Sequence, residues 1–395
     1  MFISGDEMLV IDHSDIKTNN KKRIIKLLSM ERELTKLDIS RKLDISIPTV
    51  TTIVGELMEE GLVEEAGMAN STGGRKPMII RFLPDSRYSI GIDLGRDYIR
   101  AVLTNLDSKI LKDKTCELNV ISETEVLSVI KRLIEEVIAE ENVKDKLLGI
   151  GLSLPGTVNE EDLKLEVATN FRLRNISFKE LYSHFNLPIY LENEANAGAL
   201  AESKLGIAKD LSNLIYISIT EGIGGGIFIN NYMYKGKDRR AGEIGHMCIA
   251  KDGRQCNCGR RGCWETYASN RALIKSYNEK SGSMIKHVDE ILKRYKAEDK
   301  IAVEVVDEYL DNLAEGIQSL LFIFNPDYII IGGEISKHSD IFSEKLSKII
   351  LRNNEFYSEG DVHILFSRLG EDSNILGASL IPILDSYGFT NINIK

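Results

Sequence analysis

The chain has 395 residues, 43% of them hydrophobic, and a formal net charge of −10. This length and composition can supply two or three domains with full cores, and the negative charge excludes a protein that binds nucleic acid over its whole surface, so DNA contact requires a local patch. No run of 18 apolar residues is present and the N-terminus is acidic where a secretory signal is basic, which predicts a cytoplasmic protein that does not span a membrane.

The first 86 residues predict three helices followed by two strands, the order of a winged helix-turn-helix domain. A helix with one apolar side comes first. Thr35 can cap a second helix, with Asp38 completing a capping box. Ser46 is placed to cap a third helix, and Gly61 to end it.

The start of the third helix carries small residues, several with hydroxyl groups, which suits a recognition helix in a DNA major groove. Two strand-like runs follow, 62–67 and 76–83, and basic residues lie at or near the tip of the wing between them, within reach of a minor groove or a phosphate. We therefore expect DNA contacts from Ser46, Pro48, Thr49, Thr51, Thr52, Arg75 and Lys76. The alternative is a small helical domain that contacts only protein.

Glycine turns between strand-like runs dominate the chain after residue 86. Residues 88–94 and 98–104 read as a hairpin around an Asp-x-Gly turn, which can approach a phosphate through backbone N–H groups. A buried run ends at Pro155 and Gly156, a second hairpin turns at 222–226, and a third strand runs into Gly332 and Gly333. Separated by helical stretches, these strands predict an α/β fold with two lobes and a ligand cleft between them.

Three of the five cysteines fall between residues 256 and 263, close to a histidine and two glutamates. Cytoplasmic cysteines stay reduced, so a tight cluster favours a metal site over disulfides. The alternative is a set of reduced thiols that binds no metal.

Several motifs together resemble the ROK family of repressors, open reading frames and sugar kinases, over nearly all of residues 87–395. They are Asp93-x-Gly95, ENEANAGALAE, GIGGG, EIGH, CNCGRRGCWE and IIIGGEIS. With the winged helix and its GGRKP wing, the chain is most similar to the repressor branch, of the xylose type. The resemblance implies an N-terminal winged helix-turn-helix domain (1–86) and a two-lobed, actin-like sugar-kinase domain. Its small α/β lobe would span 87–191, completed by 375–395, and its large lobe 192–374.

The resemblance also implies a metal site and a sugar site. One structural zinc ion would be bound by His246, Cys256, Cys258 and Cys263, a set that fills a tetrahedral shell and leaves no open position. Independently of the resemblance, Cys248 is two positions from His246 and would point the other way in a strand, so we expect it to be a core residue, and we expect the same of the distant Cys116. The sugar site would comprise Gly156, Asn193, Glu194, Glu243, His246 and Glu265. The alternative for each single acid is a solvated surface charge.

Three departures from the family's kinases bear on the use of a nucleotide. Glu194 stands where a kinase has its aspartate base, and this one-methylene displacement can reduce a rate on the order of 100-fold. Arg96 and Asp97 replace small residues in the phosphate turn, and Glu221 adds a charge to the glycine-rich turn. These departures predict a protein that binds sugar without phosphorylating it.

The expected function is that of a sugar-responsive transcriptional repressor of a sugar-utilisation operon, released by an aldose such as xylose or glucose. Its partners would be a palindromic double-stranded operator and a monosaccharide, and the chain would form a homodimer or a dimer of dimers. The alternatives are an ATP-dependent sugar kinase with an added DNA-binding domain and a regulator displaced by a protein partner. An apolar helix stripe favours core packing over a dimer face; it comprises Leu310, Leu313, Ile317, Leu320 and Leu321.

Overall fold

The computed structural model describes most of the chain, with gaps. The described ranges are 13–68, 77–118, 122–139, 143–209, 211–352, 354–358, 360–361 and 363–388. Arg75 and Lys76, expected at the tip of the wing, lie outside them. None of the helices in these ranges has the length and apolar character needed to cross a membrane.

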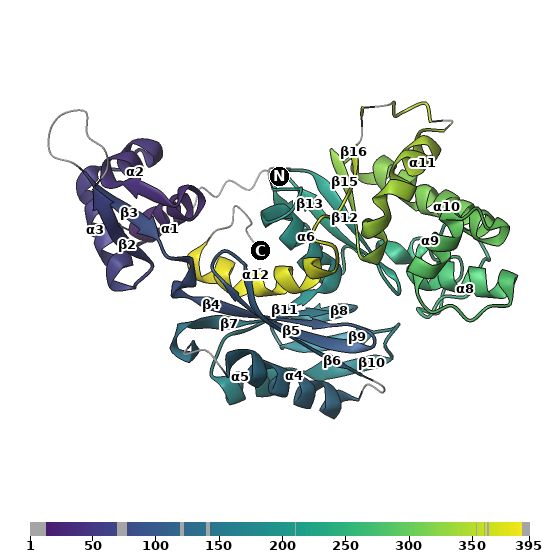
Figure 1. The fold of residues 1–395 in the computed structure, drawn as a ribbon, viewed down its shortest axis with the longest axis horizontal. Coiled ribbons are helices and arrows are strands. Elements are labelled where there is room, and N and C mark those ends of the chain that lie inside the picture. Colours follow the sequence, from purple (N-terminus) through teal and green to yellow (C-terminus); the bar gives the residue numbers. More distant parts are fainter. Residues whose placement is uncertain are drawn as a thin grey trace, which may run out of the picture.

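The N-terminal part is a winged helix-turn-helix, at the left of Figure 1. A three-stranded sheet of order β1-β3-β2 packs with three helices around a shared apolar core. The helices are α1 (His13–Glu31), α2 (Lys36–Leu43) and α3 (Ile47–Glu59), and the strands are β1 (Glu33–Thr35), β2 (Val63–Met68) and β3 (Met78–Phe82).

The predicted helix caps of this part are confirmed. The Thr35 hydroxyl accepts from the backbone N–H of Asp38, whose carboxylate accepts from the N–H of Thr35. Ser46 caps α3 by accepting from the N–H of Thr49. Gly61 follows α3 with a φ of 68°, a left-handed conformation that favours glycine.

A first five-stranded sheet, of order β11-β7-β4-β5-β6, forms the lower part of Figure 1. Its strands are β4 (Tyr88–Leu94), β5 (Tyr98–Asn105), β6 (Ile110–Glu117), β7 (Leu147–Leu154) and β11 (Ile189–Asn193). Helix α4 (Glu123–Ile138) packs against β5 and β6, and α12 (Ser373–Tyr387) packs against β4 and β7. A small sheet of β8 (Thr157–Asn159), β9 (Lys164–Ala168) and β10 (Leu173–Ser177) precedes α5 (Lys179–Phe185).

A second five-stranded sheet has the order β14-β13-β12-β15-β16. Its strands are β12 (Leu214–Ile219), β13 (Ile223–Ile229), β14 (Tyr232–Met233), β15 (Tyr328–Gly332) and β16 (His363–Phe366). Helix α6 (Glu194–Lys204) packs against β12 and β13. The other helices of this half are α7 (Glu265–Ala268), α8 (Asn270–Ser281), α9 (Val288–Lys296), α10 (Lys300–Phe324) and α11 (Ser339–Leu351).

Helices α6 and α12 pack against each other and join the two large sheets, because α6 contacts β12 and β13 while α12 contacts β4 and β7 (Figure 1). Small residues permit this close approach. A Cβ on Gly377 of α12 would lie 1.8 Å from the carbonyl oxygen of Ala197 of α6. Ile383 and Tyr387, at the end of α12, join the core of the winged helix domain. The pair thus connects both lobes to the DNA-binding domain.

The α/β architecture and the two predicted strand pairs, β4–β5 and β12–β13, are confirmed. The turn of the second hairpin, expected at 222–226, lies at 220–222, because Gly224 and Gly226 belong to β13 and allow the close approach of α6. Two cysteine predictions are wrong. Cys248 is exposed, because its segment pairs with Cys263 in a single bridge at the surface of the cysteine loop. Cys116 is only partly buried, beside Arg132 on a sheet edge. The α10 stripe from Leu310 to Leu321 is fully buried, as expected for core packing. The domain limits at 86, 191 and 374 stay predictions.

Candidate functional site

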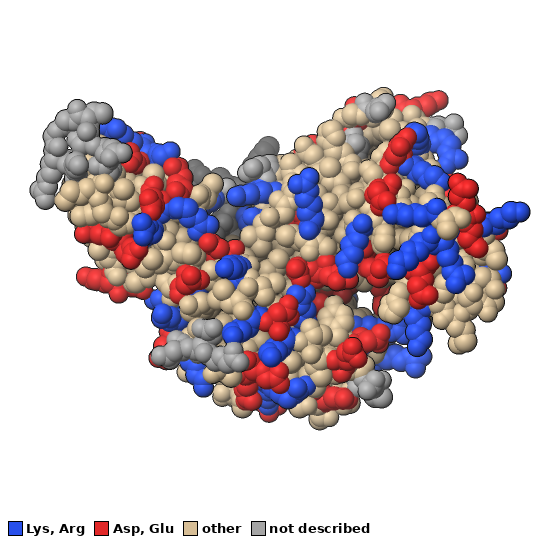
Figure 2. All heavy atoms as spheres, in the orientation of Figure 1, with Lys and Arg blue, Asp and Glu red and all other residues tan. Residues whose placement is uncertain are grey.

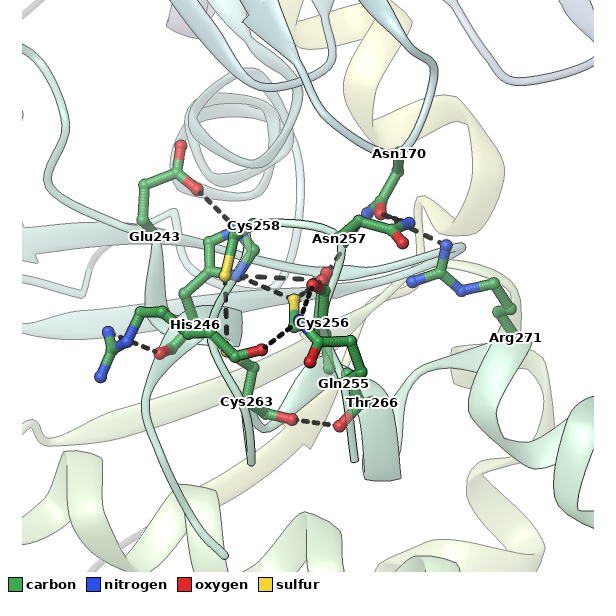
Figure 3. A network of polar contacts seen from close by, with 12 residues as sticks. Asn170, Glu243, His246, Gln255, Cys256, Asn257, Cys258, Cys263, Thr266 and Arg271 are labelled. Atoms are coloured by element: carbon green, nitrogen blue, oxygen red, sulfur yellow. Dashed lines mark hydrogen bonds and ion pairs between the residues drawn. The ribbon is translucent and has the colours of Figure 1, made fainter. Parts of the chain in front are cut away.

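His246 and three cysteines form a compact cluster (Figure 3), their ligand atoms all within 4.8 Å of one another. Cys256 Sγ lies 3.6 Å from His246 Nδ1, and the sulfurs of Cys258 and Cys263 are 3.6 Å apart. A tetrahedral zinc ion with bonds of about 2.3 Å to sulfur and about 2.0 Å to nitrogen requires edges of about 3.8 and 3.6 Å. The four side chains therefore fit one metal ion with a closed shell.

The backbone around the cluster explains its local shape. The N–H of Cys256 donates to the carbonyl of Arg260 (2.9 Å), which closes a tight loop, and Gly262 adopts a φ of 76°. A Cβ on Gly262 would lie 1.8 Å from the carbonyl oxygen of Ala250, so only glycine fits there. Trp264 is fully buried and donates from Nε1 to the carbonyl of Asn312 (2.9 Å), which anchors the loop to α10.

A polar cavity adjoins the cluster of His246 and the three cysteines, and the structure brings all six expected sugar-site residues to its wall. They are Gly156, Asn193, Glu194, Glu243, His246 and Glu265. The wall also includes several residues that the sequence did not single out, among them Asn170, Thr220 and Arg239. Carboxylates, amides and hydroxyls arranged around one space suit a polyhydroxylated ligand, because each can accept or donate to a hydroxyl group.

His246 connects the cluster to the cavity. Its Nδ1 faces Cys256 Sγ and lies 3.8 Å from a carboxylate oxygen of Glu265, while its Nε2 lies 3.7 Å from a carboxylate oxygen of Glu243. The side chain of Glu265 is 3% exposed and that of Glu243 is 42% exposed. One ring nitrogen is thus directed to the thiols and the other to Glu243 at the cavity wall. A metal ion on Nδ1 would fix the orientation of the ring.

Asn193 shapes the cavity and also caps α6. Its Oδ1 accepts from the N–H groups of Ala195 (2.9 Å) and Asn196 (3.3 Å), and its Nδ2 donates to the carbonyl of Gly156 (2.9 Å). Gly156 has a φ of 72°, and a Cβ there would lie 2.2 Å from the carbonyl oxygen of Val167. Most of the hydrogen-bonding capacity of Asn193 is therefore used in positioning the cavity wall.

Glu194, the first residue of α6, lines this cavity and a second, neighbouring one. Burial raises the pKa of its carboxyl to about 8, helped by the charges of Asp93 and Glu243. At neutral pH this carboxyl is mostly protonated, so it can donate a hydrogen bond but is a poor general base.

Asn170, on the turn between β9 and β10, contacts the cysteine loop and the cavity. Its Nδ2 donates to Glu265 (3.2 Å), and its Oδ1 accepts from Asn257 (3.0 Å) and Arg271 (3.2 Å), as Figure 3 shows. Asn170 therefore connects the side of the cleft that carries the first five-stranded sheet to the side that carries the second. No local motif marks this residue, because its partners follow it by 87 to 101 positions.

The neighbouring cavity has a volume of about 800 Å³ and lies at the β4–β5 and β12–β13 turns. By resemblance to the kinases of the family, the phosphates of a nucleotide would lie at these turns. Arg96 of the β4–β5 turn forms an ion pair with Glu221 of the β12–β13 turn, across the cleft. The hydroxyl of Tyr98 donates to Asp93 (2.8 Å), and its ring lies over Gly95. Eight carboxylate residues line this cavity: Asp93, Asp97, Asp113, Glu194, Glu221, Glu334, Glu371 and Asp372. Three cationic residues also line it, namely Arg96, Arg100 and Lys286, so carboxylates outnumber cations in this wall.

The expected DNA-contact residues of α3 lie on one accessible stretch. Ser46, Pro48, Thr51 and Thr52 are exposed, and Thr49 is half-buried. The Thr52 hydroxyl donates to the carbonyl of Pro48 (3.1 Å) within the helix. The buried face of α3 comprises Val50, Ile53, Val54 and Leu57.

The basic residues of the winged helix domain are largely engaged inside it. Lys21 pairs with Glu60, and Arg81 pairs with Glu33 (2.7 Å) and Glu64 (3.2 Å). Figure 2 accordingly shows both signs of charge interspersed on the visible face of this domain. Lys36 and Arg41 of α2, which the sequence did not single out, have no ion-pair partner among the described residues.

The fold and these sites define a protein that joins a winged helix-turn-helix to a sugar-kinase-like domain. The model of the ROK family matches residues 89–383, and a winged helix-turn-helix DNA-binding model matches residues 17–64. The chain belongs to the ROK family.

Relatives include both repressors and kinases. The chain is 33% identical to the xylose repressor of Bacillus subtilis (strain 168), over 95% of this chain and 98% of that protein. It is 31% identical to a glucokinase of Thermotoga maritima, over 74% of this chain and 96% of the kinase. A crystal structure of a ROK family transcriptional regulator, a homologue of an Escherichia coli protein called MLC, matches with a TM-score of 0.81 and 26% identity, over 95% of this chain and 98% of that one.

Proposed function

We propose that this protein is a sugar-responsive transcriptional repressor that binds operator DNA and is released by an aldose, with xylose as the first candidate. The observation that carries the proposal is the joining, in one chain, of a winged helix-turn-helix to a sugar-kinase-like cleft whose two phosphate turns are bridged by Arg96 and Glu221. The similarity to a xylose repressor along nearly the whole chain supports the choice of sugar.

The sugar would lie in the cavity beside the cysteine loop. Glu243, Glu265 and the free nitrogen of His246 would accept or donate to its hydroxyls, and the protonated carboxyl of Glu194 would donate. The ion on His246 and the three cysteines would be zinc, in a structural role; bound there, it would hold His246 and the loop that carries Glu265.

The DNA site would be the exposed start of α3 in a major groove, with Ser46, Pro48, Thr49, Thr51 and Thr52 nearest the bases and phosphates. Arg75 and Lys76 of the wing would add contacts. A homodimer would place two such helices on the half-sites of a palindromic operator. The domain limits proposed for this arrangement are 1–86, 87–191 with 375–395, and 192–374.

Helix α6 offers a direct route from sugar to DNA. Its N-terminus carries Asn193 and Glu194 at the sugar cavity, and its C-terminus at Lys204 lies near Lys26 of α1. Closing the cleft around a sugar would move α6 and, with it, α12 and the DNA-binding domain. The coupling is reciprocal, so the operator should weaken sugar binding by the factor by which sugar weakens operator binding.

A calorimetric titration with a panel of aldoses tests the sugar site directly. We expect saturable binding of one or a few aldoses, lost in Glu265→Gln and retained in the exposed control Glu279→Gln. Failure of every aldose to bind the metal-loaded protein would refute the proposal.

The second candidate is an ATP-dependent sugar kinase. Glu194 favours it, since this carboxyl lies between the sugar cavity and the neighbouring one, where a general base would act. The similarity to a glucokinase also supports it. A coupled ADP-release assay decides: we expect no sugar-dependent turnover, whereas turnover that disappears in Glu194→Ala would favour the kinase.

A further inference from the structure

A third cavity, of about 500 Å³, lies where the DNA-binding domain meets both lobes. Its walls come from α1, the β5–β6 turn, the end of α6, β13 and α12. In Figure 1, α1 faces the end of α12 across this junction. The volume is in the range of small-molecule sites, and the cavity is separate from the sugar site at the other end of α6.

The charge of this cavity is opposite to that of the chain as a whole. Four cationic side chains line it, namely Lys26, Arg32, Lys204 and Lys209, against the single carboxylate of Asp107. Arg32 holds that carboxylate at 2.8 Å. The three lysines have no carboxylate partner among the described residues. Among the described residues, two half-buried lysines, Lys26 and Lys204, and the exposed Lys209 therefore line one recess without a carboxylate partner, in a protein whose net charge is −10.

Lys204 shows how unfavourable this arrangement is without a counter-ion. Burial and, to a lesser extent, the charge of Lys26 together lower the pKa of its ammonium group to about 8. Both side chains are half-buried. An anion held between them would replace lost hydration and offset their mutual repulsion.

A buried hydroxyl in the same cavity lacks a partner. Ser108 is only 7% exposed, and its Oγ makes no hydrogen bond, although buried polar groups are normally satisfied. A hydroxyl beside lysines can donate to a phosphate oxygen. Apolar side chains complete the lining and can contact a carbon skeleton: Leu205, Leu211, Phe228, Leu380, Ile383 and Leu384.

We propose that this cavity binds a small organic phosphate, held by Lys26, Lys204 and the Ser108 hydroxyl. A phosphate group carries nearly two negative charges at neutral pH, which suits three unpaired lysines. Since Lys26 belongs to α1 and Lys204 to α6, the ligand connects the DNA-binding domain to the helix that begins at the sugar site. An effect of the bound phosphate on operator affinity rests on the proposed function, whereas the binding of phosphate to this cavity does not.

The test is a calorimetric titration of the full metal-loaded chain with inorganic phosphate, against sodium chloride at matched ionic strength and without DNA. We expect saturable phosphate binding that is about tenfold weaker or more in Lys204→Gln and clearly weaker in Ser108→Ala. Lys293→Gln, on the exposed face of α9, is the control and should bind as wild type does. Far-UV circular dichroism and the thermal midpoint establish that each variant is folded.

Two results would overturn the proposal: no heat beyond that of chloride, or equal phosphate affinity in wild type and Lys204→Gln. Lys26→Gln provides a second variant from the opposite wall and should lose phosphate affinity in the same way. Because no DNA or sugar is present, failure here is distinct from failure of the repressor function.

Discussion

At the scale of residues, His246 is the side chain that connects the cysteine cluster to the proposed sugar site. Its two ring nitrogens face opposite directions, one toward three thiols and the other toward Glu243. A metal ion on the first nitrogen would set the position of the second. The proposed zinc would therefore act on sugar binding by positioning His246.

Removing one thiol ligand tests this dependence. We expect one zinc ion per chain in the wild type by elemental analysis, and less in Cys258→Ser, with a lower thermal midpoint and at least about tenfold weaker sugar binding. The exposed Cys248→Ser is the matched control and should keep both metal and affinity. Full metal content in Cys258→Ser would show that the ligand set is wrong.

Glu194 gives a prediction on pH. Its folded-state pKa of about 8 lies above the ordinary value of 4.5, so the folded chain holds an extra proton between these values. The stability that this group contributes is therefore present below about pH 4.5 and lost as pH rises to 8. In urea unfolding, the free energy of the wild type should fall relative to that of Glu194→Gln between pH 5 and 8. Parallel curves would contradict the raised pKa.

Sequence motifs predicted both the His246–cysteine cluster and the six residues that line the adjoining cavity, and their roles as ligands stay predictions. The three cysteines lie within eight residues of one another, and the resemblance to the ROK family added His246. No sequence motif indicates Asn170, because only the folded chain brings it to Glu265. Cys248 was misassigned because alternation along a strand was assumed where the structure has one isolated bridge.

At the scale of elements, the α6–α12 contact is the joint between the lobes. Gly377→Ala should destabilise the protein by at least about 2 kcal/mol, because its Cβ would overlap the backbone of Ala197 and the helices would have to separate. Gly55→Ala in α3 meets open space and should stabilise by about 0.5–1 kcal/mol. Urea unfolding measures the free energy of unfolding of both variants. A value for Gly377→Ala equal to that of the wild type would mean that the helices separate at no cost in stability.

The exposed start of helix α3 is the predicted DNA-contact surface. Thr51→Ala should weaken operator binding by about 1–3 kcal/mol if the hydroxyl contacts a base edge, with unchanged sugar affinity and stability, because the side chain is exposed. Thr124→Ala, near the start of α4, is a control away from the winged helix. Gel-shift titrations compare them. Equal operator affinity for Thr51→Ala and wild type would remove this residue from the interface.

The sequence predicted the elements with strong patterns. The capped helices α2 and α3 and the hairpins β4–β5 and β12–β13 were recognisable, since caps and glycine turns are local signals. The small β8–β9–β10 sheet was not recognisable, because its strands have three to five residues and mix polar or charged with apolar side chains. That sheet leads to Asn170, so the missed element and the missed residue have one cause.

At the scale of the whole molecule, contacts across the cleft connect its two sides. Arg96 pairs with Glu221 on one side of the sugar cavity, and Asn170 joins Glu265 and Arg271 on another. The order of lobes and DNA-binding domain followed from family resemblance. The third, basic cavity could not be predicted from the sequence, because it forms only where α1, α6 and α12 meet in the folded chain.

The central claim is that a sugar in the cleft controls operator binding. Fluorescence anisotropy of labelled operator, titrated with the metal-loaded protein with and without saturating xylose, tests it most directly. We predict that xylose weakens operator binding at least about tenfold in the wild type and has no effect in Glu265→Gln, whose operator affinity without sugar is unchanged. Should every aldose that binds leave the affinity of the wild type for the operator the same, the account would be contradicted.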